Sequence, residues 1–275
     1  MRLAVISDLH LDINRLDVSA IAKVMADYLL KKQVDSYVLA GDTFNSLDKT
    51  REFVQQLQAL LRNKIQVFYL AGNHEMGDGK PYEEYEASKP DGYLHNQSVD
   101  FGEYRLIGNN GWYDYSFDHD QHSEKEIQRF KRVFWYDRRI AQVISDQERA
   151  LISRGQILKE VAEAKTAGQK PIVISHFSPD KKIVNAIPFS KSKMAILKAY
   201  LGSARLGEQL VDAEVPIVVS GHVHWHLPVH QEKETSYYNV SLGYETKRIH
   251  EWSQKDFFTE WQRRLLVLDL WDLFG

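Results

Sequence analysis

The chain of 275 residues contains no cysteine. Disulfide bonds and thiolate metal sites are therefore excluded, so any bound metal ion must be held by oxygen and imidazole ligands. The absence of cysteine is also consistent with a reducing compartment, and we expect the protein to be cytoplasmic.

Long apolar runs are absent as well. No stretch approaches the length of a membrane span, so we expect no transmembrane segment. The apolar run at residues 3–6 follows a single positive charge, Arg2, and is too short for a signal peptide. We therefore expect neither a membrane span nor a secretory leader.

An excess of basic residues is also missing. The chain has 35 basic and 38 acidic residues, which gives a formal net charge of −3 at pH 7. Dedicated nucleic-acid binders usually carry a basic excess, so this balance argues against a nucleic-acid partner without excluding a small phosphorylated substrate. Linkers rich in glycine, serine or proline do not separate the predicted elements, and we expect a single domain over residues 1–275.

The first part of the chain alternates short apolar runs with longer amphipathic ones. Helices are predicted at residues 18–30 and 53–61. A hairpin is predicted at residues 99–107, with its turn at Gly102 and Glu103. Strands are predicted at residues 3–6, 37–40, 67–71, 172–175, 217–220, 237–240 and 265–268. This alternation is typical of a layered α/β fold.

The middle of the chain, residues 123–167, is charged and mostly helical in pattern. The pattern breaks near Ser145 and Asp146, either of which would cap the helix that follows. Aromatic residues cluster at 112–117 and 134–136; core packing is their ordinary role, although they could also line a pocket.

Metal-capable residues follow five of the predicted strands, at the point where each strand ends. The motifs are S-D-L-H at residues 7–10, G-D at 41–42, G-N-H-E at 72–75, a lone histidine at 176 and G-H-V-H at 221–224. In open α/β folds, ligands bind at this edge of the sheet. Taken singly, each motif has an ordinary interpretation, such as a helix cap or a core histidine. Five in order indicate one shared site.

This ordered set resembles the calcineurin-like metallophosphoesterase family, whose pattern is D-x-H, G-D, G-N-H-E or G-N-H-D, a lone H, and G-H-x-H. The resemblance implies a four-layer α/β/β/α sandwich of two mixed sheets with flanking helices, and a helical cap inserted at about residues 112–168. Such a cap would help to select the substrate. The resemblance also implies two divalent cations bridged by Asp42. The other ligands would be Asp8, His10 and His224 on the first cation, and Asn73, His176 and His222 on the second.

The implied reaction is hydrolysis of a phosphomonoester or phosphodiester by a hydroxide activated between the two cations. The family histidine at the position of His74 faces the substrate, where it stabilises phosphoryl oxygens or protonates the leaving group. Mixed His, Asp and Asn ligands suit Mn, Fe, Zn, Ni or Co, and they argue against calcium. The alternatives are a nuclease and a non-catalytic, metal-binding protein-interaction scaffold of the same fold.

Two positions differ from those of well-known relatives. The serine/threonine phosphatase branch carries an arginine shortly after the aspartate of the G-D motif, where this chain has Asn45 and Ser46. This difference disfavours the dephosphorylation of proteins. Many relatives carry a second histidine after the lone one, whereas Phe177 follows His176 here. We expect Phe177 to alter the pocket wall and to leave the metals unaffected.

Overall fold

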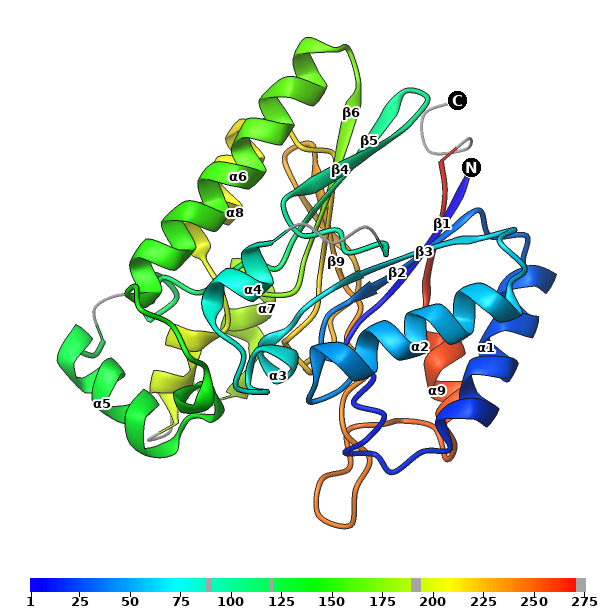
Figure 1. The fold of residues 1–275 in the computed structure, drawn as a ribbon. Helices are drawn as coiled ribbons and strands as arrows, with labels where there is room; N and C mark the ends of the chain where they lie inside the picture. The colour runs from blue at the N-terminus through cyan, green and yellow to red at the C-terminus, as the bar shows by residue number, and fades with distance from the viewer. Residues whose placement is uncertain (88–90, 119–120, 189–193, 271–275) are drawn as a thin grey trace.

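The computed structural model describes the chain except for residues 88–90, 119–120, 189–193 and 271–275 (Figure 1). The strands are β1 (Arg2–Ile6), β2 (Ser36–Ala40), β3 (Gln66–Leu70), β4 (Gln97–Phe101), β5 (Tyr104–Asn109), β6 (Lys170–Ser175), β7 (Ile217–Ser220), β8 (His230–Glu232), β9 (Thr235–Asn239) and β10 (Leu266–Asp269). The helices are α1 (Val18–Lys31), α2 (Leu47–Leu60), α3 (Asn73–Met76), α4 (Tyr82–Glu86), α5 (Glu124–Phe134), α6 (Asp146–Thr166), α7 (Lys181–Ala186), α8 (Ala204–Asp212) and α9 (Phe257–Arg264), with 3₁₀ turns η1 (Tyr136–Arg139) and η3 (Ala195–Tyr200). Among the described residues, none of these helices has the length and apolarity needed to cross a membrane.

The strands form two mixed sheets. The first has four strands in the order β10-β1-β2-β3, and the second has six in the order β4-β5-β6-β7-β9-β8. Strands β1, β2 and β3 run parallel, as do β5, β6, β7 and β9. Strands β10, β4 and β8 are antiparallel to their neighbours. In each sheet, therefore, the carboxyl ends of several parallel strands share one edge, where ligands bind in open α/β folds.

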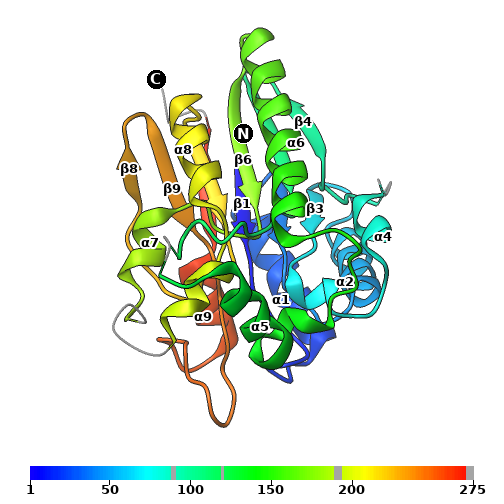
Figure 2. The same cartoon turned by 90° about the vertical axis from the view of Figure 1, so that its left-hand side faces the viewer.

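The two sheets pack face to face, and helices cover their outer faces. Val5 and Val38 of the first sheet lie in one buried cluster with Leu106 and Ile174 of the second. Helices α1 and α2 lie outside the first sheet, and α6 and α8 lie outside the second (Figures 1 and 2). The predicted sandwich of two mixed sheets between flanking helices is confirmed.

The predicted strands and the hairpin turn at Gly102 and Glu103 are present, with bounds shifted by a residue or two. The helix predicted at residues 53–61 begins earlier, at Leu47. The apolar pattern missed this start, because the first turns are polar and carry little apolar periodicity. Helices α8 and α9 were not predicted. With 9 and 8 residues, they are shorter than the stretch over which a helical period becomes distinct.

The segment expected to form a cap divides into two parts. Helix α6 packs along β5 and β6, and its Ile157 and Val161 are buried in one cluster with Ile107 and Val173. This half therefore belongs to the outer layer of the sandwich. The other half, which contains α5, does not extend this layer; it lies at the N-terminal end of α6, where Lys131 pairs with Asp146, at the end of the molecule that also holds α3 (Figure 1).

Helices α5 and α6 have the same capping box but differ in packing. Ser123 and Ser145 accept the N3 backbone N–H of α5 and α6, respectively, and the N3 glutamates bond back to them. Helix α6 buries seven residues, whereas α5 buries only Ile127 among its described residues. The start of α6 therefore contributes more to the cooperative core.

We expect Ser145→Ala to lower the free energy of unfolding by about 1 kcal/mol, because an N-cap hydrogen bond is lost in a well-packed helix. The matched variant Ser123→Ala should lower it less, since α5 can fray without opening the core. Urea denaturation followed by circular dichroism measures both. Equal losses would mean that α5 unfolds together with the sandwich.

Candidate active site

The predicted site residues lie at the edge where the parallel strands of both sheets end. Three motifs follow β1, β2 and β3 of the first sheet, and two follow β6 and β7 of the second. His222 and His224 are half-buried, and the other six side chains are buried. The structure brings together the side chains of Asp8, His10, Asp42, Asn73, His74, His176, His222 and His224.

Four of these residues have a left-handed backbone, with φ of 57° at Asp8, 44° at His10, 54° at Asp42 and 65° at His222. Such strain costs about 1–3 kcal/mol per residue and persists only where the surroundings enforce it. The N–H of His10 donates to the carbonyl of Asp42 at 3.0 Å. The N–H of His222 donates to the Asp8 carboxylate at 2.9 Å. The strained turns therefore hold one another in place.

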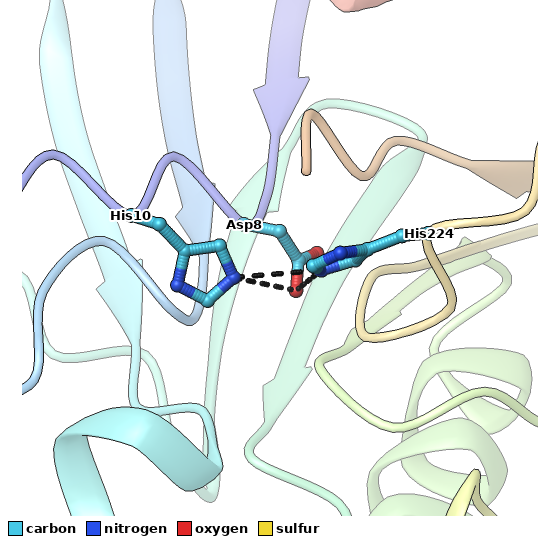
Figure 3. Close-up of side chains that lie close together, drawn as sticks. All are labelled: Asp8, His10 and His224. Atoms are coloured by element: carbon cyan, nitrogen blue, oxygen red, sulfur yellow. Dashed lines mark hydrogen bonds and ion pairs between the residues drawn. The ribbon is translucent and has the colours of Figure 1, made fainter. Parts of the chain in front are cut away.

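Asp8, His10 and His224 form a first convergent group (Figure 3). Asp8 Oδ1 lies 3.1 Å from His224 Nε2 and 3.8 Å from His10 Nε2. The two imidazole Nε2 atoms are 3.4 Å apart. Atoms that each bind one ion at about 2.0–2.2 Å are separated by similar distances, so this group fits a metal ion.

Asp42, His176 and His222 form a second group, and Asp42 also reaches the first. Asp42 Oδ2 lies 3.5 Å from His176 Nε2 and 3.8 Å from His10 Nε2. Asn73 Oδ1 joins the second group at 3.2 Å from His176 Nε2. The Asp42 carboxylate thus lies between two sets of donor atoms.

Three of the histidines use their second ring nitrogen to bond an oxygen. His176 Nδ1 lies 3.0 Å from the carbonyl of Ala40, and His222 Nε2 lies 3.2 Å from the carbonyl of Tyr200. His224 Nδ1 lies 2.7 Å from the carboxylate of Glu251. Each oxygen can accept a hydrogen bond from that nitrogen, which turns the other ring nitrogen toward the site, the usual arrangement around a metal.

The amide of Asn73 is oriented by a residue that the sequence analysis missed. Asn73 Nδ2 donates to the buried Asp137 carboxylate at 2.9 Å, so its oxygen faces His176. Burial raises the pKa of Asp137, and the Trp135 indole also donates to it, at 2.8 Å. No strand precedes Asp137, so its position in η1 could not be linked to the motifs by sequence.

Glu75 holds the turns after β2 and β3 together. Its Oε2 accepts the N–H groups of Asp42 and Gly72 at 2.8 and 2.9 Å. Its Oε1 accepts the N–H of Thr43 and the hydroxyl of Thr50, both at 2.8 Å. Burial and the nearby Asp42 raise the pKa of Glu75 to about 7, while these hydrogen bonds oppose the rise. Glu75 is thus a positioning residue within the G-N-H-E motif.

Charge is concentrated at the site. Burial opposes ionisation of Asp8, but the hydrogen bond and charge of His224 hold its pKa below the ordinary value. Burial also lowers the pKa of His222 to about 3, and the neighbouring His176 adds to this effect. Two buried carboxylates, Asp8 and Asp42, need positive charge beside them, which bound cations can supply.

His74 diverges from its neighbour Asn73. Its Nδ1 lies 2.7 Å from Asn45 Oδ1, and its ring stacks on Tyr136 with centroids 4.1 Å apart. Its Nε2 lies 3.0 Å from the hydroxyl of Tyr244. Its ring also converges with His10 and Asp42, so geometry alone allows His74 a ligand role as well.

A cavity of about 410 Å³ opens over the site. Of the aromatic cluster, Trp135 and Tyr136 line this cavity, whereas Trp112, Tyr113 and Phe117 are buried in the core. The remaining lining residues are Asp42, Asn73, His74, Ile187, Leu197, Leu201, His222, Val223, His224, Trp225, Tyr244 and Glu251. The described walls beyond the motif residues are therefore largely apolar.

Phe177 does not line the cavity, contrary to our expectation for this position. It is buried, with its ring centroid 4.6 Å from that of His222, and it also packs on Trp112. The residue supports a candidate ligand from behind, because the chain after β6 turns inward to the core.

Comparison with known proteins places these features in context. A sequence model for the family described as calcineurin-like phosphoesterase matches residues 1–226. No curated protein sequence matches the chain. Among solved structures, phosphopantetheinyl hydrolase from Mycobacterium tuberculosis is similar with a TM-score of 0.67 and 16% identity, over 98% of this chain and 95% of that chain. A dimetal phosphatase from Danio rerio is similar with a TM-score of 0.47 and 10% identity, over 87% of this chain and 86% of that chain.

We expect Glu75→Gln to lower the free energy of unfolding by about 2–3 kcal/mol, because both Glu75 oxygens accept from donors and an amide NH₂ would face donors in either orientation. The control is Glu126→Gln, where a single exposed oxygen accepts and the amide can turn its oxygen to the same place. Chemical denaturation measures both variants. A loss no larger than that of the control would contradict the role assigned to Glu75.

Proposed function

This chain belongs to the calcineurin-like phosphoesterase family, and we propose that it hydrolyses a phosphomonoester or phosphodiester with the help of two divalent cations. The observation that carries the proposal is the position of Asp42 between two groups of donor atoms. A carboxylate in this position could be shared by two cations, which is what a two-metal site would use to hold them as a pair.

In this proposal, Asp42 holds both cations. Cations held there would supply Lewis acidity for activating water and positive charge for the phosphoryl oxygens. The donor set contains imidazoles, an amide and only two carboxylates, so it suits Mn, Fe, Zn, Ni or Co better than calcium. The other proposed ligands are Asp8, His10 and His224 on one side, and Asn73, His176 and His222 on the other.

His74 is the proposed catalytic residue of the chain itself. Its Nε2 is 3.9 Å from Asp42 Oδ2, so a phosphoryl group bound over Asp42 would lie within its reach. Asn45 holds Nδ1, which directs Nε2 toward the cavity. In its doubly protonated form, with Nδ1–H donating to Asn45 and a second proton on Nε2, the imidazole can stabilise a phosphoryl oxygen or protonate the leaving oxygen.

The cavity favours a small substrate. Its volume of about 410 Å³ and the net charge of −3 suit a compact phosphorylated molecule better than a nucleic acid. Apolar walls such as Leu197 and Trp225 suit an ester with an apolar portion. A phosphopantetheinyl ester therefore belongs in a substrate panel, because the similar structure from Mycobacterium tuberculosis is a phosphopantetheinyl hydrolase.

The alternative is a metal-binding scaffold without turnover. Metal content does not separate the two functions, because a scaffold could retain both ions. Hydrolysis of bis-p-nitrophenyl phosphate in the presence of Mn separates them directly. Absence of turnover with this ester and with the wider panel would favour the scaffold.

We expect two Mn ions per chain after loading, and we expect Asp42→Ala to empty both sites or to leave one weak site, because the shared carboxylate is lost. Elemental analysis after gel filtration measures the content. The control Asp48→Ala removes an exposed carboxylate of α2 and should retain both ions. Two tightly held ions in Asp42→Ala would exclude the bridging role.

We expect His74→Asn to keep both ions and to lose activity on an alkyl phosphate by about 10²–10⁴-fold, with a smaller loss on a nitrophenyl phosphate. An alkoxide leaving group needs the proton, whereas nitrophenolate hardly does. Steady-state kinetics on the two esters, together with metal analysis, provide the test. Equal losses would make His74 a phosphoryl-oxygen binder, and loss of metal would make it a ligand.

A further inference from the structure

Residues 227–275 lie outside the part of the chain that matches the family, yet two of them reach the site. Tyr244 and Glu251 lie in the loop between β9 and α9, which is coloured orange in Figures 1 and 2. Both line the cavity over Asp42. The loop is therefore part of the site rather than a distant connection.

Tyr244 packs against three of the site histidines. Its ring centroid lies 4.4 Å from that of His10 and 4.8 Å from that of His224. Its hydroxyl lies 3.0 Å from His74 Nε2, the nitrogen that faces the cavity. A phosphoryl group near His74 Nε2 would therefore lie near the Tyr244 hydroxyl as well.

The direction of this hydrogen bond follows from a chain of fixed groups. Asn45 donates its backbone N–H and its Nδ2 to Asp12 Oδ2, at 3.0 and 3.1 Å, so its amide oxygen must face His74. That oxygen accepts from His74 Nδ1. In neutral His74, Nε2 is then an acceptor, and the hydroxyl of Tyr244 donates to it. Tyr244 thus presents a donor proton at the cavity face of His74.

We propose that Tyr244 is a second substrate-contacting residue, whose hydroxyl donates a hydrogen bond to a phosphoryl oxygen beside His74, and that Glu251 positions Tyr244 and His224 together. This proposal rests on the proposed phosphoesterase function. A phosphoryl oxygen takes the place of His74 Nε2 as the acceptor. No covalent bond to Tyr244 is formed, and the hydroxyl keeps its proton throughout.

Glu251 links the loop to a proposed metal ligand through a single atom. Its Oε2 accepts from His224 Nδ1 and from the backbone N–H of Tyr244, both at 2.7 Å. The N–H of Glu251 donates back to the carbonyl of Tyr244 at 2.9 Å. Orientation of the imidazole and placement of the tyrosine therefore depend on the same carboxylate.

The base of the loop is tied down from a second side. Asn14 accepts the N–H of Glu245 at 2.8 Å and donates to the carbonyl of Gly243 at 3.1 Å. Trp252 Nε1 donates to the same carbonyl, also at 3.1 Å. These bonds fix the backbone on both sides of Tyr244, so its hydroxyl is held ready for a ligand.

The first test uses Tyr244→Phe in the full chain loaded with Mn, with Tyr238→Phe on β9 as the matched control outside the site. We expect both Mn ions and the unfolding midpoint to be kept. Turnover should fall by about 10–100-fold to a similar extent on alkyl and nitrophenyl phosphates, because the lost donor acts on the phosphoryl group and not on the leaving group. Affinity for inorganic phosphate, measured by calorimetry, should fall at least several-fold.

Calorimetry separates failure of this proposal from failure of the proposed function. If the parent chain binds phosphate but hydrolyses no ester, the function fails, and the phosphate affinity of Tyr244→Phe still decides the role of the hydroxyl. Unchanged affinity and turnover in Tyr244→Phe would overturn the proposal. Stronger binding would also overturn it, since Tyr244 would then obstruct the site. A parent chain that neither binds phosphate nor hydrolyses any ester would overturn both.

The second test concerns Glu251. Glu251→Ala should weaken Mn binding by about 10–100-fold through His224. At saturating Mn it should also reduce phosphate affinity by as much as Tyr244→Phe does. Glu251→Gln should restore most of the Mn affinity and most of the phosphate affinity, because an amide oxygen can still accept from His224 and Tyr244.

The double variant Tyr244→Phe/Glu251→Ala should bind phosphate no more weakly than Glu251→Ala alone. Additive losses would show that Glu251 does not act through Tyr244.

Discussion

The site depends on the buried carboxylate of Glu75, which is not among the proposed metal ligands. The Glu75 carboxylate accepts hydrogen bonds from backbone N–H groups in the turn after β2 and in the turn after β3. These bonds fix the distance between the two turns. Asp42 lies in the turn after β2, and Asn73 follows the turn after β3. The Asp42 carboxylate also accepts the N–H of His74 at 2.8 Å. Without Glu75, the donors of these two turns would be buried without a partner, and the strained backbone at Asp42 would have less to hold it.

The two sheets contribute to the site in complementary ways. The first sheet supplies Asp8, His10 and Asp42 on turns with a left-handed backbone, and the second sheet supplies imidazoles that reach across to them. The N–H of His222, after β7, donates to the carboxylate of Asp8, after β1. Face-to-face packing of the sheets is thus a condition for the proposed two-metal site, because each sheet alone carries only some of the proposed donors.

Segments outside the motifs shape the surroundings. Asp137 in η1 orients the Asn73 amide, and Trp135 and Tyr136 form one wall of the cavity. Tyr244 and Glu251 approach from the loop before α9. Lys131, one of several cations on α5, pairs with the buried Asp146 at 2.6 Å and so ties α5 to the start of α6. The family motifs thus lie at the bottom of a cavity whose walls come from less regular parts of the chain.

The sequence by itself determined the layered α/β class, nearly all strands, and the eight residues that meet at the sheet edge, because buried parallel strands and the polar residues after them form local patterns. Their roles as ligands and as catalyst stay predictions. Tertiary structure decided that α6 belongs to the outer layer and that Phe177 faces the core. It also decided which oxygen atoms orient the side chains of the site. Asp137 orients the amide of Asn73, and Glu251 orients the ring of His224. These partners are 64 and 27 residues apart along the chain, so no local period could link them, and only the packing of separate elements brings them within hydrogen-bond distance.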